Sequence, residues 1–188
     1  MGSKASVLVV DDEQEVADVY ALRLKDSYET ETAYGGAEAL DKIGEETDVV
    51  LLDRRMPDVS GDEVLDRIKE RGLSCRVIMI TAVDPGFDIL EMPFDDYLCK
   101  PVDKDDLVAA IEQQLAARRY DDRLTEYLET TSKLALLEAE KPPSEMDAND
   151  EVTRLRERAT KLKQELDDAL DEFDDIDTAF REVERTPN

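Results

Sequence analysis

The chain has 188 residues and carries 24 Lys and Arg against 49 Asp and Glu, which gives a formal net charge of −25, and it contains no histidine. This composition excludes zinc sites built on histidine, Ser-His triads and a phosphohistidine on the chain itself. The length suffices for one domain of ordinary size and a smaller appendage, and since no apolar stretch approaches the roughly 20 residues that span a bilayer, we expect a soluble, cytoplasmic protein.

Strand and helix patterns alternate five times up to about residue 118. Short apolar runs rich in Val and Ile are typical of buried parallel strands. Four such runs and one more polar run occur at residues 7–10, 28–33, 49–52, 77–80 and 97–99. Helical spacing follows four of them, and the last helix begins at Asp103, whose side chain can cap it. Because right-handed crossovers place helices on both faces of a parallel sheet, we predict a doubly wound α/β fold with five parallel strands.

Polar residues follow four of these strands at the point where each strand ends. They are Asp11 with Asp12, then Asp53, Thr81 and Lys100. In open α/β sheets, ligands bind beyond the carboxyl ends of the strands. We therefore expect three carboxylates, one hydroxyl and one ammonium group to meet at one edge of the sheet.

The chemistry of this set points to phosphoryl transfer at a metal site. The carboxylates of Asp11, Asp12 and Asp53 would repel one another unless a cation lay among them, and oxygen ligands without His or Cys select Mg²⁺ or Mn²⁺. Asp53 stands alone after its strand and can attack phosphorus to form an acyl phosphate. Lys100 supplies positive charge, and the Thr81 hydroxyl can donate to a phosphoryl oxygen.

The segment between Thr81 and Lys100 is short. Pro85 and Pro93 bracket it and leave room for barely two turns of helix. We therefore expect the helix between the fourth and fifth strands to be reduced.

Beyond residue 119 the strand pattern disappears and two helical segments follow. A helical stripe at 124–135 ends near Lys141, and Pro142, Pro143 and Ser144 break it. In the second segment, 151–185, apolar residues alternate spacings of three and four over five heptads, which predicts a helix about 50 Å long with a continuous apolar seam. The seam consists of Val152, Leu155, Ala159, Leu162, Leu166, Ala169, Phe173, Ile176, Phe180 and Val183.

Three interpretations of this seam stay open: a helical hairpin, a self-associating coiled coil, and a seam that only a partner orders. The stripe at 124–135 covers about two heptads against five, so it would leave Phe173, Ile176, Phe180 and Val183 facing water. We therefore predict that the distal half of the seam packs against residues 151–185 of a second chain, as a homodimer, or against a partner.

The residues at the strand ends match a known family. Those that match are Asp11 and Asp12, Asp53 followed by Met56, Pro57 and Gly61, Thr81 followed by Ala82, and Asp96, Tyr97 and Leu98 before Lys100 and Pro101. On these motifs, residues 5–118 closely resemble the response regulator receiver domain, the CheY-like family. The resemblance implies a flavodoxin-like, CheY-like sheet of five parallel strands.

The resemblance also implies how the acidic residues act. Asp53 would accept a phosphoryl group from a histidine kinase. Asp11, Asp12 and Asp53 would hold Mg²⁺ together with the backbone carbonyl of Arg55. The protein would then be no enzyme toward other molecules, since its only catalysis would be the Mg²⁺-dependent gain and loss of its own phosphoryl group.

The remaining motif residues would read out that modification. Lys100 would contact the phosphoryl group, and the peptide bond before Pro101 would be cis. Thr81 and Tyr97 would form the switch pair, in which the hydroxyl moves toward the phosphate while the ring turns inward.

The tail, residues 119–188, is similar to the HalX domain, a C-terminal module typical of haloarchaeal proteins. Strong salt screens the self-repulsion of so acidic a chain, so the composition suits a salt-rich cytosol. An acidic protein of an ordinary cell is the alternative.

The charge of the tail argues against direct nucleic-acid binding. Residues 119–188 hold 11 basic and 21 acidic side chains, whereas phosphate contacts need clustered Lys and Arg. A local basic stretch runs from Arg154 to Lys163, and we expect its charges to pair with nearby Glu. The tail would then signal to an output protein that the sequence does not identify, with transcription as the first candidate.

A different class of function stays open beside this one. The carboxylate cluster could belong to a Mg²⁺-dependent phosphatase or phosphotransferase for small molecules, with a tail that only oligomerises. No sequence feature supplies a substrate pocket or a second general acid, so we favour the phosphorylation-controlled switch. Turnover of small phosphate esters would reverse that order.

Overall fold

The structure, a computed structural model, describes residues 4–82 and 85–182, and for residues 172–182 it describes the backbone alone. The chain forms two compact units, one reaching to Leu115 and the other spanning Ala116–Ala179. The elements are β1 (Ser6–Val10), α1 (Gln14–Leu24), β2 (Glu29–Ala33), α2 (Gly36–Lys42), β3 (Val49–Leu52), α3 (Gly61–Glu70), β4 (Arg76–Thr81), the 3₁₀ helix η1 (Phe87–Glu91), β5 (Asp96–Cys99), α4 (Lys104–Glu140), α5 (Pro143–Asp147) and α6 (Asp150–Glu182).

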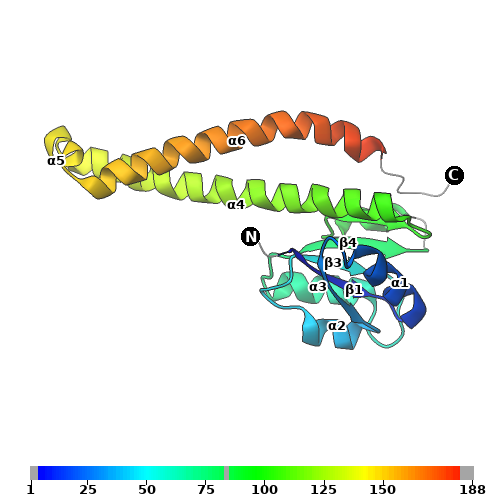
Figure 1. The fold of residues 1–188 in the computed structure, drawn as a ribbon. Helices are drawn as coiled ribbons and strands as arrows, with labels where there is room; N and C mark the ends of the chain where they lie inside the picture. Colours follow the sequence, from blue (N-terminus) through cyan, green and yellow to red (C-terminus); the bar gives the residue numbers. More distant parts are fainter. Residues whose placement is uncertain (1–3, 83–84, 183–188) are drawn as a thin grey trace. The chain divides into compact units, whose positions relative to one another are not determined.

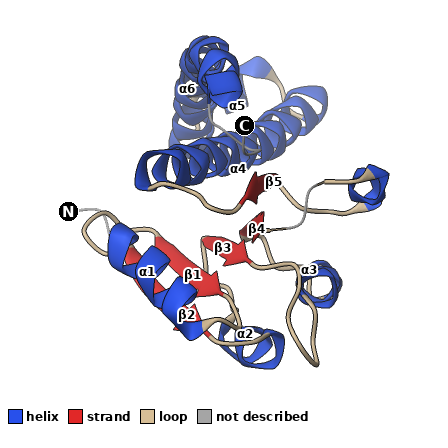
Figure 2. Ribbon diagram, turned by 90° about the vertical axis from the view of Figure 1, so that its right-hand side faces the viewer, coloured by secondary structure: helices blue, strands red, loops and turns tan. Residues whose placement is uncertain are grey.

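The first unit is built on a parallel sheet (Figure 1), and the strand order is β2-β1-β3-β4-β5 (Figure 2). All four strand pairs are parallel, and β1 lies between β2 and β3 in the sheet. This arrangement confirms the predicted five-stranded, doubly wound α/β fold. The apolar runs of β1, β3 and β4 form the middle of the sheet, where both faces are covered.

Helices cover both faces of this sheet (Figure 2). Alternate side chains of a strand point to opposite faces. In β1, Val7 and Val9 pack with α1 and the first turns of α4, whereas Leu8 and Val10 pack with α2 and α3. Burial of each such side chain contributes on the order of 1.5–3 kcal/mol. The two apolar layers fix the sheet, and its carboxyl edge carries the predicted site residues.

The segment between β4 and β5 contains no α-helix in its described residues, 85–95. One 3₁₀ helix, η1, occupies Phe87–Glu91, in agreement with the reduced helix that the two prolines predict. Ile89 packs against the apolar layer of α2 and α3, while Phe87 and Leu90 are 92% and 78% exposed.

The helix α4 begins at Lys104, and Asp103 caps it by accepting from the backbone N–H of Asp106 at 2.9 Å. It runs without a break to Glu140, so the separate helices expected from Asp103 and from about residue 119 are one helix. The reason is the absence of Pro and Gly between Asp103 and Lys141. With 37 residues, α4 is about 55 Å long. The expectation that the helix before the prolines is too short to cover the seam of the next helix is therefore wrong.

In the second unit, the later part of α4 and the helix α6 form a hairpin closed by α5. Seam residues Val152, Ala159, Leu162 and Leu166 are buried within the single chain, and Leu162 is 0% exposed. The hairpin interpretation is therefore confirmed for the proximal half of the seam. Nothing among the described helices is long and apolar enough to cross a membrane.

The distal seam residues, Phe173, Ile176, Phe180 and Val183, lie outside the side chains that the structure describes. Their packing against a second chain or a partner stays a prediction. Nearer the turn, ion pairs join the two helices of the hairpin: Glu126 accepts two bonds of 2.6 Å from Arg158, and Arg156 pairs with Glu138 at 3.5 Å. Two arginines of the basic stretch thus pair with Glu of the other helix, while Lys161 pairs with Glu165 within α6, as the sequence predicts.

Candidate functional site

Backbone hydrogen bonds continue the parallel ladder beyond the ends of the strands. The N–H of Asp53 donates to the Val10 carbonyl at 2.9 Å, and the N–H of Lys100 donates to the Thr81 carbonyl at 2.9 Å. These bonds extend the sheet by one residue and hold Asp53 and Lys100 at its carboxyl edge. Strand pairing therefore determines where the predicted site residues lie.

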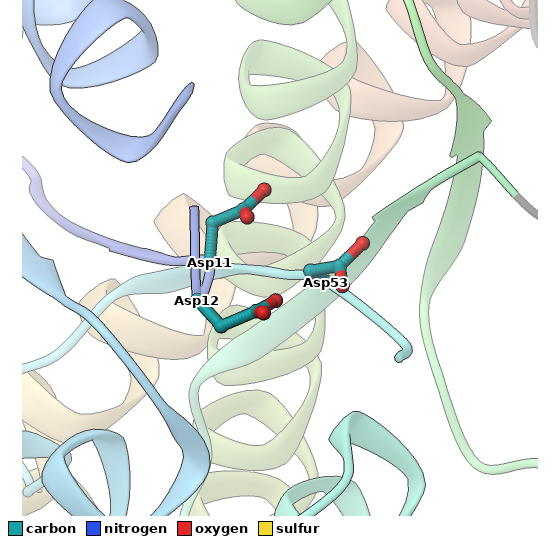
Figure 3. Close-up of side chains that lie close together, drawn as sticks. All are labelled: Asp11, Asp12 and Asp53. Atoms are coloured by element: carbon teal, nitrogen blue, oxygen red, sulfur yellow. The ribbon is translucent and has the colours of Figure 1, made fainter. Parts of the chain in front are cut away.

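The three predicted acidic residues come together at this edge. One carboxylate oxygen each from Asp11, Asp12 and Asp53 lies within 4.8 Å of the others (Figure 3). Asp11 is 2% exposed and Asp53 is 6% exposed, while Asp12 faces solvent. Two buried carboxylates and a third beside them repel strongly in a medium that screens poorly.

Lys100 neutralises part of this charge. Its Nζ lies 2.5 Å from Oδ2 of Asp11 and 3.2 Å from Oδ1 of Asp53. Burial works against the charge on Lys100, but the bonds with Asp11 and Asp53 outweigh burial and raise its pKa above the ordinary value. The peptide bond between Lys100 and Pro101 is cis, as the resemblance implies.

The carboxylate of Asp53 is held on its other side by the backbone. The N–H of Arg55 donates to Oδ2 of Asp53 at 3.1 Å. Burial raises the pKa of Asp53, Lys100 lowers it, and the charges of Asp11 and Asp12 raise it further, so that the net shift is upward.

The two predicted switch residues lie at the ends of β4 and β5. The Thr81 side chain is 1% exposed, and the Tyr97 side chain is 6% exposed. The Tyr97 ring packs in the apolar layer of α2 and α3, with its centroid 5.5 Å from that of Phe94. Arg55 lies beside Asp53 with an exposed side chain.

A glycine controls how closely α3 approaches the site. A Cβ on Gly61 would lie 2.1 Å from the Asp53 carbonyl oxygen and 2.8 Å from Cα of Arg54. The N–H of Gly61 donates to the Arg54 carbonyl at 2.9 Å, and Ser60 caps α3 by accepting from the N–H of Glu63 at 3.2 Å. The loop after Asp53 is therefore clamped against the start of α3, and only glycine fits at position 61.

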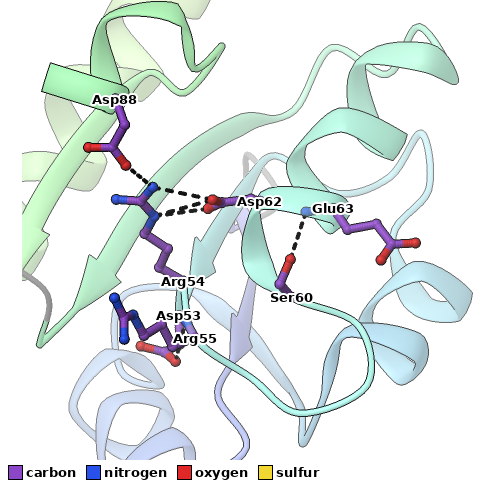
Figure 4. A network of polar contacts seen from close by, with 7 residues as sticks. All are labelled: Asp53, Arg54, Arg55, Ser60, Asp62, Glu63 and Asp88. Carbon is purple, nitrogen blue, oxygen red and sulfur yellow. Dashed lines mark hydrogen bonds and ion pairs between the residues drawn. The ribbon is translucent and has the colours of Figure 1, made fainter. Parts of the chain in front are cut away.

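Sequence reasoning did not single out Arg54, which the structure places in a network next to the site. Its guanidinium donates to Asp62 at the start of α3, with Nε to Oδ1 at 3.0 Å, and pairs with Asp88 of η1 (Figure 4). Burial raises the pKa of the Tyr97 hydroxyl and Arg54 acts in the opposite direction, so that the net shift is upward. The available signal was the position of Arg54 directly after Asp53 in a strongly acidic chain.

The donor set fits a hard divalent cation. Three carboxylates converge, and Lys100 balances only one of their charges. All three supply oxygen, which such cations prefer, and a chain without histidine offers no imidazole that would favour zinc at this edge. An ion among the three carboxylates would relieve their remaining repulsion.

Two family models match the chain. The model for the response regulator receiver domain matches residues 7–112, and the model for the HalX domain matches residues 116–184. Together they cover both units of the structure.

Proteins with similar sequences include one regulator from an archaeon and one from a bacterium. A Haloferax volcanii protein named as a transcriptional regulator is 41% identical over 95% of this chain. The transcriptional regulatory protein CutR of Streptomyces coelicolor is 44% identical over 56% of it. The chain spans about a third of the length of the first protein, 32%, and about half of the second, 51%.

Solved structures resemble the first unit. A CheY-like response regulator receiver domain protein from Methanospirillum hungatei is 30% identical, with a TM-score of 0.58, over 63% of this chain and 99% of that one. The Thermotoga maritima response regulator DrrB, an OmpR/PhoB homolog, is 29% identical, with a TM-score of 0.55, over 60% of this chain and 52% of that one.

Proposed function

Since the chain belongs to the response regulator receiver domain family and carries a HalX domain after the receiver, we propose that Asp53 accepts a phosphoryl group from a histidine kinase. The observation that carries this proposal is the convergence of Asp11, Asp12, Asp53 and Lys100 at the carboxyl edge of the sheet.

In the proposed reaction, a carboxylate oxygen of Asp53 attacks the phosphorus of the donor. A bond forms between that oxygen and phosphorus, while the bond from phosphorus to the imidazole nitrogen of the kinase histidine breaks. The leaving nitrogen takes the electron pair. The product is an acyl phosphate, and water later hydrolyses it to restore Asp53.

Residues of the chain would direct this attack. The N–H of Arg55 and the ammonium of Lys100 hold the two oxygens of Asp53 at 3.1 and 3.2 Å, so the nucleophile has a fixed orientation. As negative charge moves from the carboxylate to the phosphoryl oxygens, the Lys100 ammonium can contact these oxygens, and the Thr81 hydroxyl can donate to one of them.

A divalent cation is part of the proposal. Asp11, Asp12 and Asp53 would hold Mg²⁺ together with the backbone carbonyl of Arg55. When bound, Mg²⁺ neutralises charge on the carboxylates and on the phosphoryl oxygens. Asp11 is already oriented for such a role, because its Oδ1 accepts from the N–H of Glu13 at 2.9 Å.

The proposed output is a change in transcription through a protein that meets the tail. The names of the Haloferax and Streptomyces relatives support this direction. Within the receiver, Thr81 and Tyr97 would transmit the conformational change that follows phosphorylation. The histidine kinase would phosphorylate the protein in the cytoplasm. The tail carries more acidic than basic side chains, and Arg156 and Arg158 are already paired with Glu. Since binding to phosphates needs clustered Lys and Arg, these features favour a protein over a nucleic acid as the target of the tail.

Labelling with a small phosphodonor in the presence of Mg²⁺ tests the proposal. The parent chain should gain one phosphoryl group, Asp53→Asn none, and the parent in EDTA far less. Equal labelling of Asp53→Asn would place the acceptor elsewhere, and undiminished labelling in EDTA would remove the cation from the proposal. Repeated turnover of small phosphate esters would favour an enzyme instead.

A further inference from the structure

Arg54 joins the start of α3 and the 3₁₀ helix η1 through one guanidinium group. Its side chain is only 13% exposed. It donates from Nε to Asp62 at 3.0 Å and from its terminal nitrogen to the same carboxylate at 3.3 Å, and that terminal nitrogen also pairs with Asp88. A planar guanidinium held by two carboxylates has little freedom. Figure 4 shows Asp62 and Asp88 on different segments, with Arg54 between them.

One of the joined elements is the 3₁₀ helix η1. It turns two large apolar side chains, Phe87 and Leu90, to solvent and only Ile89 inward. So small an apolar contact contributes little to holding a segment of five residues in place. The ion pair between Arg54 and Asp88 adds a polar anchor, and the hydrogen bond from Arg54 lowers the pKa of the Asp88 carboxyl.

The ring of Tyr97 on β5 contacts the chain segment that follows η1. The ring is buried, and its centroid lies 5.5 Å from that of Phe94. Phe94, against which the ring packs, lies in the segment between η1 and β5. A movement of the Arg54 guanidinium would therefore reach η1 through Asp88, and a movement of the segment after η1 would reach Tyr97 through Phe94.

The backbone links Arg54 to the chemistry at Asp53. The peptide unit between Arg54 and Arg55 donates its N–H to Oδ2 of Asp53 at 3.1 Å. When that carboxylate becomes an acyl phosphate, its charge moves to phosphoryl oxygens, with about −1.5 to −2 charges at pH 7 on an ordinary phosphoryl side chain. If Oδ1 carries the phosphoryl group, Oδ2 stays as a neutral carbonyl oxygen, which accepts this N–H more weakly than a carboxylate does, so the hold on the peptide unit that follows Arg54 changes.

We propose that Arg54 is a positioning residue that holds η1 in place through Asp88, and that this hold changes when Asp53 is phosphorylated. This inference rests on the proposed function of Asp53 for its second half alone. In the unmodified protein, Arg54 anchors η1 through Asp88. In the phosphorylated protein, the weaker hold on the peptide unit that follows Arg54 changes that anchor.

A fluorescent reporter on η1 tests both halves in the full chain. The protein has no tryptophan, so Phe87→Trp introduces a single reporter at a side chain that is 92% exposed. Its fluorescence anisotropy is measured in 2 M KCl, first alone and then with Mg²⁺ and beryllofluoride, a mimic of the phosphoryl group. In this background we compare Arg54→Gln, Asp88→Asn and, as matched control, Arg67→Gln, whose pair with Glu63 lies exposed on α3.

The control should keep the anisotropy of the background protein. Arg54→Gln and Asp88→Asn should both lower it, and in both the change on adding beryllofluoride should fall by at least half. The double variant should match the single ones, because both remove the same pair. Circular dichroism verifies folding, and Asp88, whose side chain is 55% exposed, provides a variant that does not disturb the core.

Several outcomes would overturn the inference. Unchanged anisotropy in both variants would show that Arg54 does not hold η1. A beryllofluoride response that disappears in Arg54→Gln but stays whole in Asp88→Asn would show that the pair between Arg54 and Asp88 does not transmit the change to η1. Mass measurement of phosphoryl occupancy separates the two proposals: absence of label on the parent rejects the function proposed for Asp53, while the anisotropy of the unmodified variants still decides the anchoring role.

Discussion

The close approach between Gly61 and the backbone of Asp53 and Arg54 predicts that Gly61→Ala lowers both stability and the rate of phosphorylation. The new Cβ would lie 2.1 Å from the carbonyl oxygen of Asp53 and 2.8 Å from Cα of Arg54. Both neighbours are backbone atoms, so no side chain can rotate away. The two segments must separate by about 1 Å to restore contact distances, and such overpacking costs about 1–3 kcal/mol. For a chain of this length, that cost lowers the melting temperature by about 2–12 °C.

The same separation moves the phosphoacceptor. Asp53 precedes the clamped peptide units, and a displacement of about 1 Å in a reacting group can cost about a hundredfold in rate. We therefore expect Gly61→Ala to slow phosphoryl incorporation from a small phosphodonor by at least tenfold. Stability is measured by thermal unfolding in 2 M KCl, and incorporation is measured by intact mass over time.

Gly44→Ala is the matched control, because a Cβ at Gly44 would meet nothing within 4 Å. It should melt at the parent temperature or slightly above, since alanine restricts the unfolded chain. If Gly61→Ala melts and reacts like Gly44→Ala, the clamp between α3 and the loop after Asp53 does not exist as described.

Three further predictions concern charge and the tail. The melting temperature should rise between about 0.1 M and 2 M KCl, and relief of about 2 kcal/mol of repulsion would give about 4–8 °C; a flat profile would count against adaptation to salt. Leu162→Ala removes a side chain that is 0% exposed and should cost about 2–5 kcal/mol in chemical unfolding, whereas Leu170→Ala, at a side chain 50% exposed, should cost far less; equal effects would reject the hairpin packing. Sedimentation in strong salt should show a larger assembly for the full chain than for a chain that ends after Glu165, or else partner capture that only the full chain performs; two monomers with equal capture would leave the distal seam without an association role.

The sheet and its acidic edge could be predicted from sequence because the signals are local and periodic. Short runs such as Val7–Val10 read as buried strands, and each ends on a polar residue, so parallel pairing brings Asp11, Asp53 and Lys100 together without knowledge of the packing. The short helix before β5 could also be predicted from sequence, because Pro85 and Pro93 limit the length of any helix between them.

Other features could not be derived from local signals. The continuity of α4 depends on the absence of any breaker between Asp103 and Lys141, whereas the change of pattern at about 119 suggested a division. The role of Arg54 depends on Asp62 and Asp88, which lie 8 and 34 residues further along the chain, and the two arginines after Asp53 give no sign of these partners.

Locating the phosphoryl group tests the central claim most directly. After reaction with a small phosphodonor and Mg²⁺, the modified protein is reduced with borohydride, which converts an aspartyl phosphate to homoserine, and its peptides are sequenced by mass spectrometry. We predict homoserine at position 53 and at no other aspartate, from a modification that is stable to acid and labile to base. Homoserine at Asp11 or Asp12, or a label that survives base, would contradict the account.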